Sequence, residues 1–523
     1  MPDALISTIN TSLEIDDVGK NIYINNEDDY NSFVTLCNTF TFDNSHKKVF
    51  HITKDLSFGE NNQPDPIKNF YHILDGHGFK ISGISKQNQT ITYLNDDTSL
   101  NLGLIVNNNY GIIRNISLEN CNLSLNSVSG VVNENDKYGV GLIVGKNYPS
   151  GEIRRCKLLA DHISNGSSIN ACALTGTPNY VYGGICGVNN CGIIDSCVNG
   201  ATITCTQNMT VGCIVGASGN FNGEATSSGT ISNSYNIVNV SFISNPKIFG
   251  GIVGFLSHTE CVENCIQLLD ITSFPTTTSS VFAGEIAGKV ENISSGSITS
   301  DQITNIFWCY YINSSSTNVG IGNSDIDDID GVVTKRTWSQ IIDMDTYHRS
   351  YDFGNIWIMS DMFDEIYHIT DSRRPMLLYE VSISGYKDDT DWFDPKIYKH
   401  QIKTATQIAS LKTIINMDAV KNSSKVHVFD QINDISFNGK LFTHPIGTKE
   451  VPFKEIYNGN GYKMSDIRFG GYVPIPSNIQ NISIERACTI FGYNYGIIEN
   501  VWLYNCKVNP NNFSSTTLVD INN

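Results

Sequence analysis

The sequence is poor in charged residues and poorest in basic ones. Charged side chains make up 16% of the 523 residues, and 34 Lys and Arg stand against 52 Asp and Glu, which gives a formal net charge of −18 at pH 7. Because phosphate binding is driven by Lys and Arg that neutralise the backbone, this balance argues against a nucleic-acid groove. It argues equally against a general footprint on anionic membranes.

Long apolar runs are also missing. No stretch of about 18 consecutive apolar residues occurs, so we expect no transmembrane helix. The first residues, Met1–Thr8, contain neither a basic segment nor a long apolar run, and we do not interpret them as a secretory signal peptide.

Cysteine spacings typical of metal sites are absent too. The chain has 14 Cys but no C-x-x-C pair, and the nearest approach, Cys261 with Cys265, has no His at metal-site spacing. We therefore interpret most cysteines as small buried apolar residues. A disulfide between stacked strands about 4.8 Å apart would be feasible, but without a signal peptide we favour free thiols. We expect no cofactor and no metal.

What the sequence does contain is a returning phrase: Gly, a variable residue, Ile, a small apolar residue, Gly. Its copies are Gly141–Gly145, Gly183–Gly187, Gly212–Gly216, Gly250–Gly254 and Gly284–Gly288, with a weaker first copy at Gly103–Val106 that is followed by Asn107. The copies start roughly 30 to 40 residues apart, a period that indicates a stacked array of repeats rather than one compact core.

The phrase predicts a ladder of like residues inside a solenoid. Alternate residues of a strand face opposite sides, so the Ile at position three should face the core and position two should face outward. The inward Ile residues would be Ile105, Ile143, Ile185, Ile214, Ile252 and Ile286. A second inward ladder would consist of Ile116, Cys156, Cys197, Tyr235, Cys265 and Cys309. We predict an all-β fold, a right-handed parallel β-helix with two or three short strands per coil and short capping helices.

These phrases and their flanks resemble the GLUG-motif repeats of large surface and secreted proteins. Phe70–Ile84 is similar to the opening element of such domains, and Arg336–Ile342, Asp352–Trp357 and Arg374–Leu377 are similar to their closing element. The resemblance covers roughly residues 20 to 380. It implies a β-solenoid scaffold of pectate-lyase-like architecture, and it supplies no catalytic residues.

The chain divides into five predicted parts. They are an N-terminal arm (1–20), an opening cap with the first coil (21–101), the repeat coils (102–310), a closing element (311–387) and a second, truncated copy of the opening module (388–523). Apolar residues at helical spacing predict helices over Asn26–Phe40, Trp338–Tyr347 and Thr404–Ile415. We expect residues 85–101 to loop outward and Asp388–Pro395 to be a linker.

The second module is predicted from an internal duplication. Asp434–Phe437 answers Asp55–Phe58, Asn458–Ile467 answers Asp75–Ile84, and Asn494–Asn500 answers Asn109–Asn115. After one phrase, Thr489–Gly492, the sequence runs out, so we expect a coil end that exposes Ile490, Phe491, Val501 and Leu503. Such an end invites pairing with another chain, although the tail could also fold back over it.

No set of residues predicts catalysis. Asp75 lies in a turn element, where hydrogen bonding to the turn is the expected role. Arg114, Arg154, Arg155 and Asp195 recur at similar positions of successive coils and predict an outward Arg–Asp ladder or, alternatively, a binding face. His51, His72, His77 and His162 are scattered without a partner Ser or Cys. The acidic loop Asn323–Gly331 lacks the spacing of a calcium-binding EF-hand loop, and we interpret it as a solvated turn.

We therefore expect a structural or interaction protein rather than an enzyme. The favoured setting is a large DNA virus particle, as a minor capsid or surface component, because the Asn- and Ile-rich composition suggests an AT-rich genome. The alternative is a cell-surface or extracellular adhesin or carbohydrate-binding β-helix, in which sequons such as Asn88–Thr90, Asn115–Ser117 and Asn481–Ser483 would matter. A polysaccharide-degrading enzyme is the least favoured. Expected partners are other protein subunits, contacted through the C-terminal module, and glycans in the alternative.

Overall fold

The computed structural model describes most of the chain, in two compact units. The described residues are 13–16, 19–39, 47–92, 100–129, 138–159, 173–175, 180–205, 208–220, 228–237, 240–268, 281–291, 303–312, 319–323, 328–353, 356–359, 374–383, 387–442, 444–469 and 489–508. The first unit, Met1–Ile341, is called the long unit below, and the second, Ile342–Asn523, is called the C-terminal unit. The long unit ends before the predicted boundary at residue 387.

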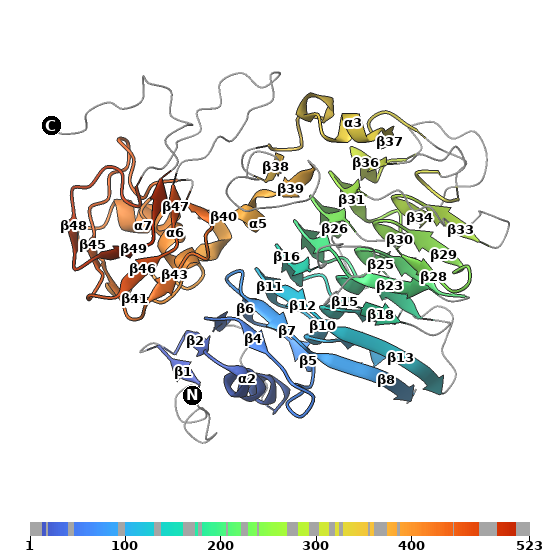
Figure 1. Ribbon diagram of the computed structural model, residues 1–523, viewed down its shortest axis with the longest axis horizontal. Helices are drawn as coiled ribbons and strands as arrows, with labels where there is room; N and C mark the ends of the chain where they lie inside the picture. The colour runs from blue at the N-terminus through green and yellow to red at the C-terminus, as the bar shows by residue number, and fades with distance from the viewer. Residues whose placement is uncertain are drawn as a thin grey trace. The chain divides into compact units, whose positions relative to one another are not determined.

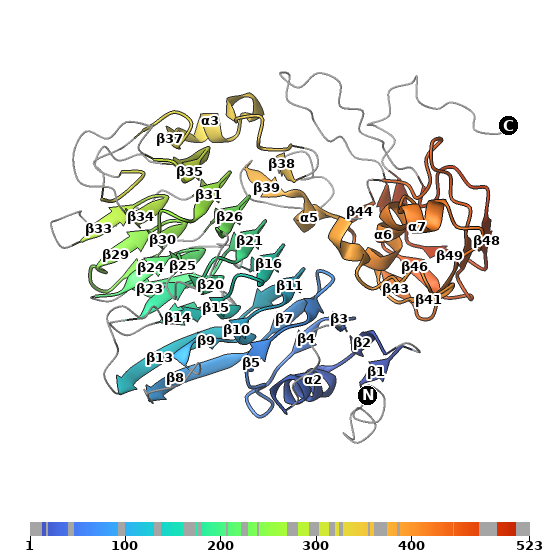
Figure 2. The ribbon, with the colours of Figure 1, turned by 180° about the vertical axis from the view of Figure 1, so that it is seen from behind.

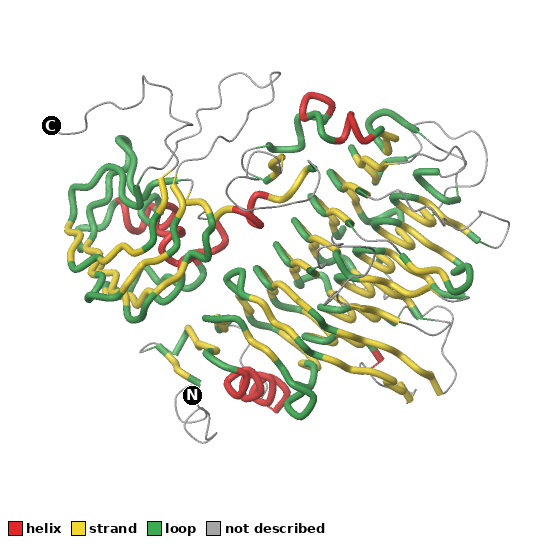
Figure 3. Tube along the Cα trace, in the orientation of Figure 1, coloured by secondary structure: helices red, strands yellow, loops and turns green. Residues whose placement is uncertain are grey.

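The long unit is a parallel β-helix, as predicted (Figures 1 and 2). Each full coil has five strands instead of the predicted two or three. The chain passes through five sheets in turn, which we number I to V, and then enters sheet I again one coil further on. Almost all of its regular structure is strand, with helices at the periphery (Figure 3). Successive coils add strands to each sheet in parallel, so each sheet runs along the stack.

The strands of each sheet follow in stacking order. Sheet I contains β9 (Leu102–Gly103), β14 (Gly139–Gly141), β19 (Val181–Gly183), β24 (Thr210–Gly212), β29 (Ile248–Gly250) and β33 (Phe282–Gly284). Sheet II contains β5 (Ile67–Phe70), β10 (Val106–Asn109), β15 (Val144–Asn147), β20 (Cys186–Asn189), β25 (Val215–Ser218), β30 (Val253–Leu256) and β34 (Ala287–Val290). Sheet III contains β1 (Glu14–Ile15), β2 (Asn21–Ile24), β3 (Val49–Ile52), β6 (Ile73–Asp75), β11 (Ile112–Arg114), β16 (Glu152–Arg154), β21 (Ile193–Asp195), β26 (Thr230–Ser232), β31 (Cys261–Glu263) and β35 (Ile306–Phe307), with β1 antiparallel to β2.

Sheets IV and V complete the coil. Sheet IV contains β4 (Leu56–Ser57), β7 (Lys80–Ser82), β12 (Ser117–Glu119), β17 (Lys157–Leu158), β22 (Val198–Asn199), β27 (Tyr235–Asn236), β32 (Ile266–Gln267), β36 (Cys309–Ile312) and β37 (Val333–Arg336). Sheet V contains β8 (Ser85–Thr92), β13 (Asn122–Ser129), β18 (Ala173–Thr175), β23 (Thr202–Cys205) and β28 (Ser241–Phe242). The predicted outward loop over 85–101 is therefore wrong for residues 85–92, which pair with β13.

The repeated phrase forms the bend between sheets I and II. In the second copy, Gly183 ends β19 and Cys186 begins β20. A Cβ at Gly183 would lie 1.9 Å from the Cys186 carbonyl oxygen, so only glycine allows the two strands to fold so closely together. The Ile ladder is confirmed, since all six Ile side chains are fully buried.

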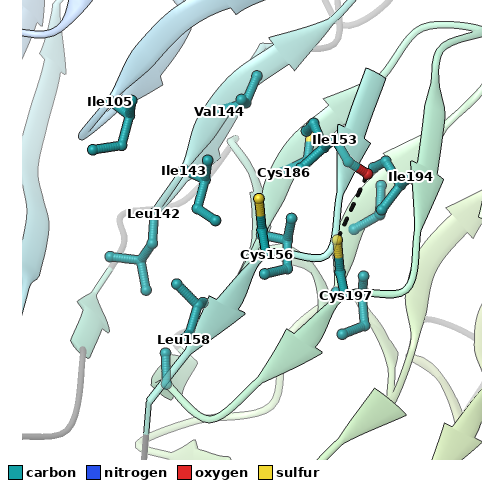
Figure 4. Close-up of a cluster of buried hydrophobic side chains, with 14 of the residues drawn as sticks. Ile105, Leu142, Ile143, Val144, Ile153, Cys156, Leu158, Cys186, Ile194 and Cys197 are labelled. Atoms are coloured by element: carbon teal, nitrogen blue, oxygen red, sulfur yellow. Dashed lines mark hydrogen bonds between the residues drawn. The ribbon is translucent and has the colours of Figure 1, made fainter. Parts of the chain in front are cut away.

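Position two of the phrase is buried as well, which corrects the prediction that it faces outward. Leu142, Cys213 and Glu285 are each fully buried at this position. The reason is that the phrase bends within its length, so the strict alternation of an extended strand does not hold across it. Figure 4 shows Leu142 and Ile143 beside Val144 in the core.

A second ladder follows the corner between sheets III and IV. Cys156, Cys197, Cys265 and Cys309 are buried there, and each thiol lies within hydrogen-bond distance of the carbonyl two residues earlier. The coil of β26 places Ser234 in this ladder, with its hydroxyl donating to the Ser232 carbonyl (2.7 Å). The prediction of Tyr235 at this position is therefore wrong by one residue, and Tyr235 begins β27 instead. Figure 4 shows Cys156 and Cys197 in the core.

The first coil of the long unit is covered by a helix, as predicted. Helix α2 (Glu27–Thr39) has three acids in its first turn, where the helix dipole favours them, and Asn26 Oδ1 accepts from the Asp29 N–H (2.9 Å). Its buried Phe33 ring lies 4.5 Å from the ring of Phe50, on β3. The helix therefore covers apolar side chains that a bare coil end would expose.

The segment predicted to close the long unit has little regular structure. It contains α3 (Trp338–Ile341), the 3-10 helix η3 (Met344–Thr346), the antiparallel strands β38 (Trp357–Met359) and β39 (Pro375–Leu377), and α5 (Leu378–Val381). The helix predicted over Trp338–Tyr347 is thus interrupted, and Asp343 Oδ1 accepts from the Asp345 N–H at the break.

The C-terminal unit is a second, shorter β-helix-like module with three sheets per coil. Sheet VI contains β41 (Lys399–Ile402), β42 (Val428–Gln431), β45 (Ile456–Asn458) and β48 (Ile497–Glu499). Sheet VII contains β43 (Ile435–Ser436), β46 (Lys463–Ser465) and β49 (Trp502–Tyr504). Sheet VIII contains β40 (Ser382–Ile383), β44 (Leu441–Phe442), β47 (Arg468–Phe469) and β50 (Lys507–Val508).

A helix also covers the start of this module. Helix α6 (Ala405–Ile414) is confirmed, with Thr404 as its N-cap in a capping box with Gln407, and α7 (Asp418–Lys421) follows. The predicted linker Asp388–Pro395 is wrong, because it holds the 3-10 helix η5 (Lys387–Thr390) and buries Trp392 and Phe393 in the core of this unit. The Trp392 indole N–H donates to Ser410 Oγ (3.0 Å) on α6.

Candidate functional site

A cluster of polar side chains gathers around Asp75, at the corner where β6 leads to β7. Asp75 is buried, and its Oδ2 lies 2.8 Å from Arg114 Nε on the next strand of sheet III. Its Oδ1 accepts from Asn115 Nδ2 (2.9 Å) and from the His77 backbone N–H (2.9 Å). The expected turn role of Asp75 is confirmed, but the same carboxylate also joins two coils.

Two histidines extend this cluster along sheet III. His51 Nε2 lies 2.9 Å from Asn21 Oδ1, and His51 Nδ1 lies 2.8 Å from His77 Nε2. Because the Asn21 oxygen can only accept, a neutral His51 carries its proton on Nε2 and accepts from His77 Nε2–H. That leaves His77 Nδ1 unprotonated, 3.6 Å from Asp75 Oδ1.

Burial and the neighbouring charges act in opposite directions on the pKa values of Asp75 and His77. Burial would raise the pKa of Asp75, but the positive charges of His77, Arg114 and His51 and the Asn115 hydrogen bond outweigh it and lower that pKa below its usual range. Burial lowers the pKa of His77, Asp75 opposes this shift, and Arg114 adds to it. The cluster is therefore an ionised aspartate and a cationic arginine beside two histidines in contact with each other.

The predicted Arg–Asp ladder exists in register, but its first member is not a solvated surface residue. Arg114, Arg154 and Asp195 are successive partners on β11, β16 and β21. Arg114 is buried, while Arg154 Nε lies 2.9 Å from Glu152 Oε2. Arg155 leaves the ladder at the corner and donates from Nε to Asn115 Oδ1 (2.8 Å). The Arg155 contact joins two neighbouring coils, whereas Arg154 and Glu152 lie on the same strand, β16.

Sequence reasoning treated the histidines as scattered, and so missed that His51 and His77 meet. The pairing of strands brings them together, because His51 lies opposite Asp75 in sheet III. This pairing cannot be deduced from the sequence without knowing how the first coils stack. His72 lies outside the cluster, where the Lys48 N–H approaches its Nδ1 (3.4 Å). His162 lies outside the described residues.

Buried amide ladders also join the coils. Asn109 Nδ2 donates to Asn147 Oδ1 (2.8 Å), and Asn147 Nδ2 donates to Asn189 Oδ1 (2.9 Å). In sheet IV, Asn199 Nδ2 donates in the same way to Asn236 Oδ1 (2.8 Å). Asn147 and Asn236 each accept from one coil and donate to the next, so their buried amides are satisfied across the stack.

The C-terminal unit repeats the Asp75 corner without its ion pair. Asn458 takes the place of Asp75, and its Oδ1 accepts from the Asn460 N–H (3.0 Å) and from Asn500 Nδ2 (3.0 Å). Glu499 pairs with Asn458 in sheet VI as Arg114 pairs with Asp75 in sheet III. The turn is therefore retained while the buried ion pair is replaced.

The last described coil of the C-terminal unit, residues 497–508 and here called the terminal coil, is unusually exposed. Leu503 pairs with the fully buried Met464 and so faces inward, yet it is 48% exposed; Val508 is 53% exposed. Trp502 and Tyr504 face the other way and are 50% and 59% exposed. At their positions the long unit has Ser117 and Glu119.

An exposed apolar end is therefore present, as predicted from the sequence, but only some of the predicted residues belong to it. Leu503 is exposed and Val501 is partly exposed, whereas Ile490 is only 4% exposed and belongs to the core. Phe491 also packs against that core, with its ring 5.1 Å from Phe453. Lys463 holds its ammonium over the outward rings, 4.5 Å from the centre of Trp502 and 5.8 Å from that of Tyr504.

Two general features bear on the kind of site. Within the described part of the chain, no three His, Cys, Asp or Glu side chains come together as a metal ion would need. Among the same residues, no helix combines the length and apolar character that crossing a membrane requires. The acidic loop Asn323–Gly331 lies partly outside the described residues. The described cysteines are free thiols, most of them buried.

The fold places the chain in the class of parallel β-helix proteins. No family model matches the sequence, and a comparison with curated proteins finds no match. A search of solved structures finds a chain from Bacteroides ovatus described as a "putative immunoglobulin A1 protease", with 15% sequence identity and a TM-score of 0.40. The similarity covers 70% of this chain and 94% of that one.

Proposed function

We propose that this protein is a non-enzymatic structural and interaction protein whose C-terminal unit contacts another protein subunit. The terminal coil carries the proposal, because it presents inward-type apolar residues, Leu503 and Val508, about half exposed. A coil of this kind buries such residues only against a following rung. An exposed apolar rung flanked by open strand edges is a surface that pairs with another chain.

The chemistry of the polar cluster supports a structural role for the long unit. Asp75, Arg114 and Asn115 are buried and bonded to one another across two coils. Groups held in this way stabilise the stacking of coils and are shielded from a substrate in solution. The long unit then serves as a rigid scaffold, and we propose that its repeats belong to the GLUG type that they resemble.

The proposed setting is a large DNA virus particle, in which the protein would be a minor capsid or surface component. The support is the Asn- and Ile-rich, acidic composition. The competing class is a cell-surface adhesin or carbohydrate-binding β-helix. Mass spectrometry of purified particles and of secreted and surface fractions separates the two, since a virion component must co-purify with particles in fixed proportion.

The contact itself is tested with one substitution and one matched control. Leu503→Asp places a charge in the apolar rung, and Glu450→Lys changes an exposed residue of the same unit outside the terminal coil. We expect Leu503→Asp to reduce incorporation into particles at least tenfold and Glu450→Lys to leave it unchanged. Equal incorporation of Leu503→Asp and wild-type protein would refute the proposed contact.

A further inference from the structure

We propose that the partner of the terminal coil is the terminal coil of a second copy of this chain, related by a two-fold axis through Leu503. This inference rests on the proposed function and names its partner. It places the two coils end to end, so that each supplies the rung that the other lacks among the described residues.

Strand edges are available for such pairing. β48, β49 and β50 are the outermost strands of sheets VI, VII and VIII, and each is paired on one side only among the described strands. Their outer N–H and C=O groups can hydrogen-bond to another strand. Beneath them, the inward side chains of the previous coil, Met464 and Phe469, already form a packed core.

A two-fold axis across the coil end determines which strands meet. This axis runs perpendicular to the stacking direction and passes through the middle of β49. It therefore places β49 antiparallel to the β49 of the second copy. The same rotation brings β48 against the second copy's β50, again antiparallel. β48 and β50 of one copy are separated from β49 by the same number of residues. The corners that join them to β49 contain Asn500 and Asn505, which both have the left-handed conformation (φ 54° and 50°).

The side chains that this arrangement brings together are complementary. Leu503 meets its own copy on the axis, and Ile498 meets the second copy's Val508; all are inward-type residues whose partners one rung below are buried. On the outer side, Trp502 meets Tyr504, an aromatic cross-strand pair. Glu499 and Lys507, both exposed, meet as opposite charges on each side of the axis.

The sequence of the equivalent coil in the long unit lacks this complementarity. The positions of Glu499 and Lys507 correspond there to Arg114 and Asn122, and those of Trp502 and Tyr504 correspond to Ser117 and Glu119. The long unit continues with further coils at that point, so no second copy is needed. The self-complementary residues therefore occur in the terminal coil, which is exposed, and not in its buried counterpart in the long unit.

The opposite end of the C-terminal unit cannot serve as the partner surface. Helix α6 packs there with Ile408, Leu411 and Ile414 fully buried. A head-to-tail contact would have to displace this helix, whereas the two-fold contact leaves it in place. The geometry therefore favours a closed dimer over an open filament.

Sedimentation equilibrium of the full chain over a range of concentrations tests the inference by charge reversal. We expect a wild-type dimer, and we expect Glu499→Lys or Lys507→Glu to raise the dimer dissociation constant about tenfold at low salt. The double variant Glu499→Lys with Lys507→Glu restores opposite charges and should recover dimerisation. Glu450→Lys is the matched control, and Leu503→Asp should raise the dissociation constant about 100-fold or more.

The outcomes separate this inference from the proposed function. A wild-type chain that stays monomeric, or a double variant no better than the single ones, overturns the two-fold dimer. If Leu503→Asp still abolishes incorporation into particles in that case, the proposed contact stands and the partner is a different protein. Dimerisation with rescue by the double variant, but with normal incorporation of Leu503→Asp, supports the dimer and refutes its role in assembly. If the Leu503→Asp variant still dimerises and is still incorporated into particles, both the two-fold dimer and the proposed contact are refuted.

Discussion

Two corners of the molecule, one in each unit, differ mainly in how deeply the residues that follow them are buried. Asn109–Asn115 and Asn494–Asn500 share the sequence Asn-Tyr-Gly-Ile-Ile, and the Asn that ends each segment takes nearly the same left-handed conformation (φ 57° and 54°). In the long unit, Leu118 after this corner is fully buried; its counterpart Leu503 is 48% exposed. Local sequence therefore determines the corner, and the next coil determines whether the corner contributes to a core.

The same comparison applies to the polar groups. In the long unit the corner holds a buried ion pair, Asp75 with Arg114, and in the C-terminal unit Asn458 makes the same turn hydrogen bonds without a charge. A buried ion pair tolerates the loss of one partner poorly. A neutral amide at a partly exposed corner is easier to replace, because water can satisfy what remains.

The largest expected effect comes from removing these two equivalent side chains. Asp75→Ala takes the carboxylate from Arg114, Asn115 and His77, and should lower the free energy of unfolding of the long unit by about 3 kcal/mol. Asn458→Ala should cost the C-terminal unit about 1 kcal/mol. Urea denaturation with hydrogen exchange of each unit measures both. Equal losses would mean that the ion pair adds nothing to the shared turn.

A difference of similar size is expected for the apolar pair. Leu118→Ala empties a fully buried position and should cost about 3 kcal/mol, in the usual range for a core leucine. Leu503→Ala removes a half-exposed side chain and should cost about 1 kcal/mol or less when measured below the dimer dissociation constant. A loss of about 3 kcal/mol in the Leu503 variant at that dilution would show that the terminal coil is already covered.

Acidification should destabilise the long unit more than the C-terminal unit. Burial and the charges of Lys48 and Lys47 lower the pKa of His72 to about 4 from 6.5, and burial lowers that of His77 as well. Since the unfolded chain binds these protons more readily, stability is complete above about pH 6.5 and falls as the pH drops towards 4. For His72 alone the loss at pH 5 is roughly 2 kcal/mol.

In the C-terminal unit, burial and the charge of Lys412 lower the pKa of His444 to about 4. Burial raises the pKa of Glu455, so this group favours the folded state as the pH falls and works in the opposite direction. Thermal melting at pH 7 and pH 5 checks the difference. His72→Gln should reduce the pH dependence of the long unit, with His444→Gln as the matched variant, and identical profiles for wild type and His72→Gln would contradict the assignment.

The smallest effect is a difference in thiol reactivity with no change in stability. Cys121 and Cys506 occupy equivalent positions after the left-handed residues Asn120 and Asn505, and their thiols point at the carbonyls of Glu119 and Tyr504. Cys121 is fully buried and Cys506 only partly.

Mass spectrometry after brief alkylation should therefore find Cys506 modified well before Cys121. Because burial raises the pKa of Cys506, the reaction is best run at mildly alkaline pH. The Glu499→Lys variant keeps the terminal coil accessible if dimers form. Slower labelling of Cys506 than of Cys121 in that variant would contradict the exposure of the coil.

Several features could be predicted from sequence because they depend on neighbouring residues. The periodic Ile phrase indicated stacked coils, and all six Ile side chains are buried. Apolar residues at helical spacing identified both covering helices, α2 and α6. The duplication of Asp75–Ile84 in Asn458–Ile467 identified β45 and β46 as counterparts of β6 and β7.

Other predictions were wrong because they required the exact position of a bend in the chain. The five strands per coil depend on corners at non-glycine residues such as Arg155, Ser196 and Trp308, whose positive φ values (50°, 54° and 53°) no local signal announces. An error of one residue at such a corner exchanges inward and outward positions, as it did for Ser234 and Tyr235. The burial of position two of the phrase was missed for the same reason.

The sequence by itself determined that the chain builds two β-helix modules, each started by a helix, since repeat period, capping and corner residues act over short distances. The tertiary structure alone decided which side chains meet across coils, such as Arg114 with Asp75, 39 residues apart. It also decided that Leu118 is core and Leu503 is surface. The physical reason is that inserts of varying length set the register between coils, and the burial of an inward side chain depends on which residues pack over it.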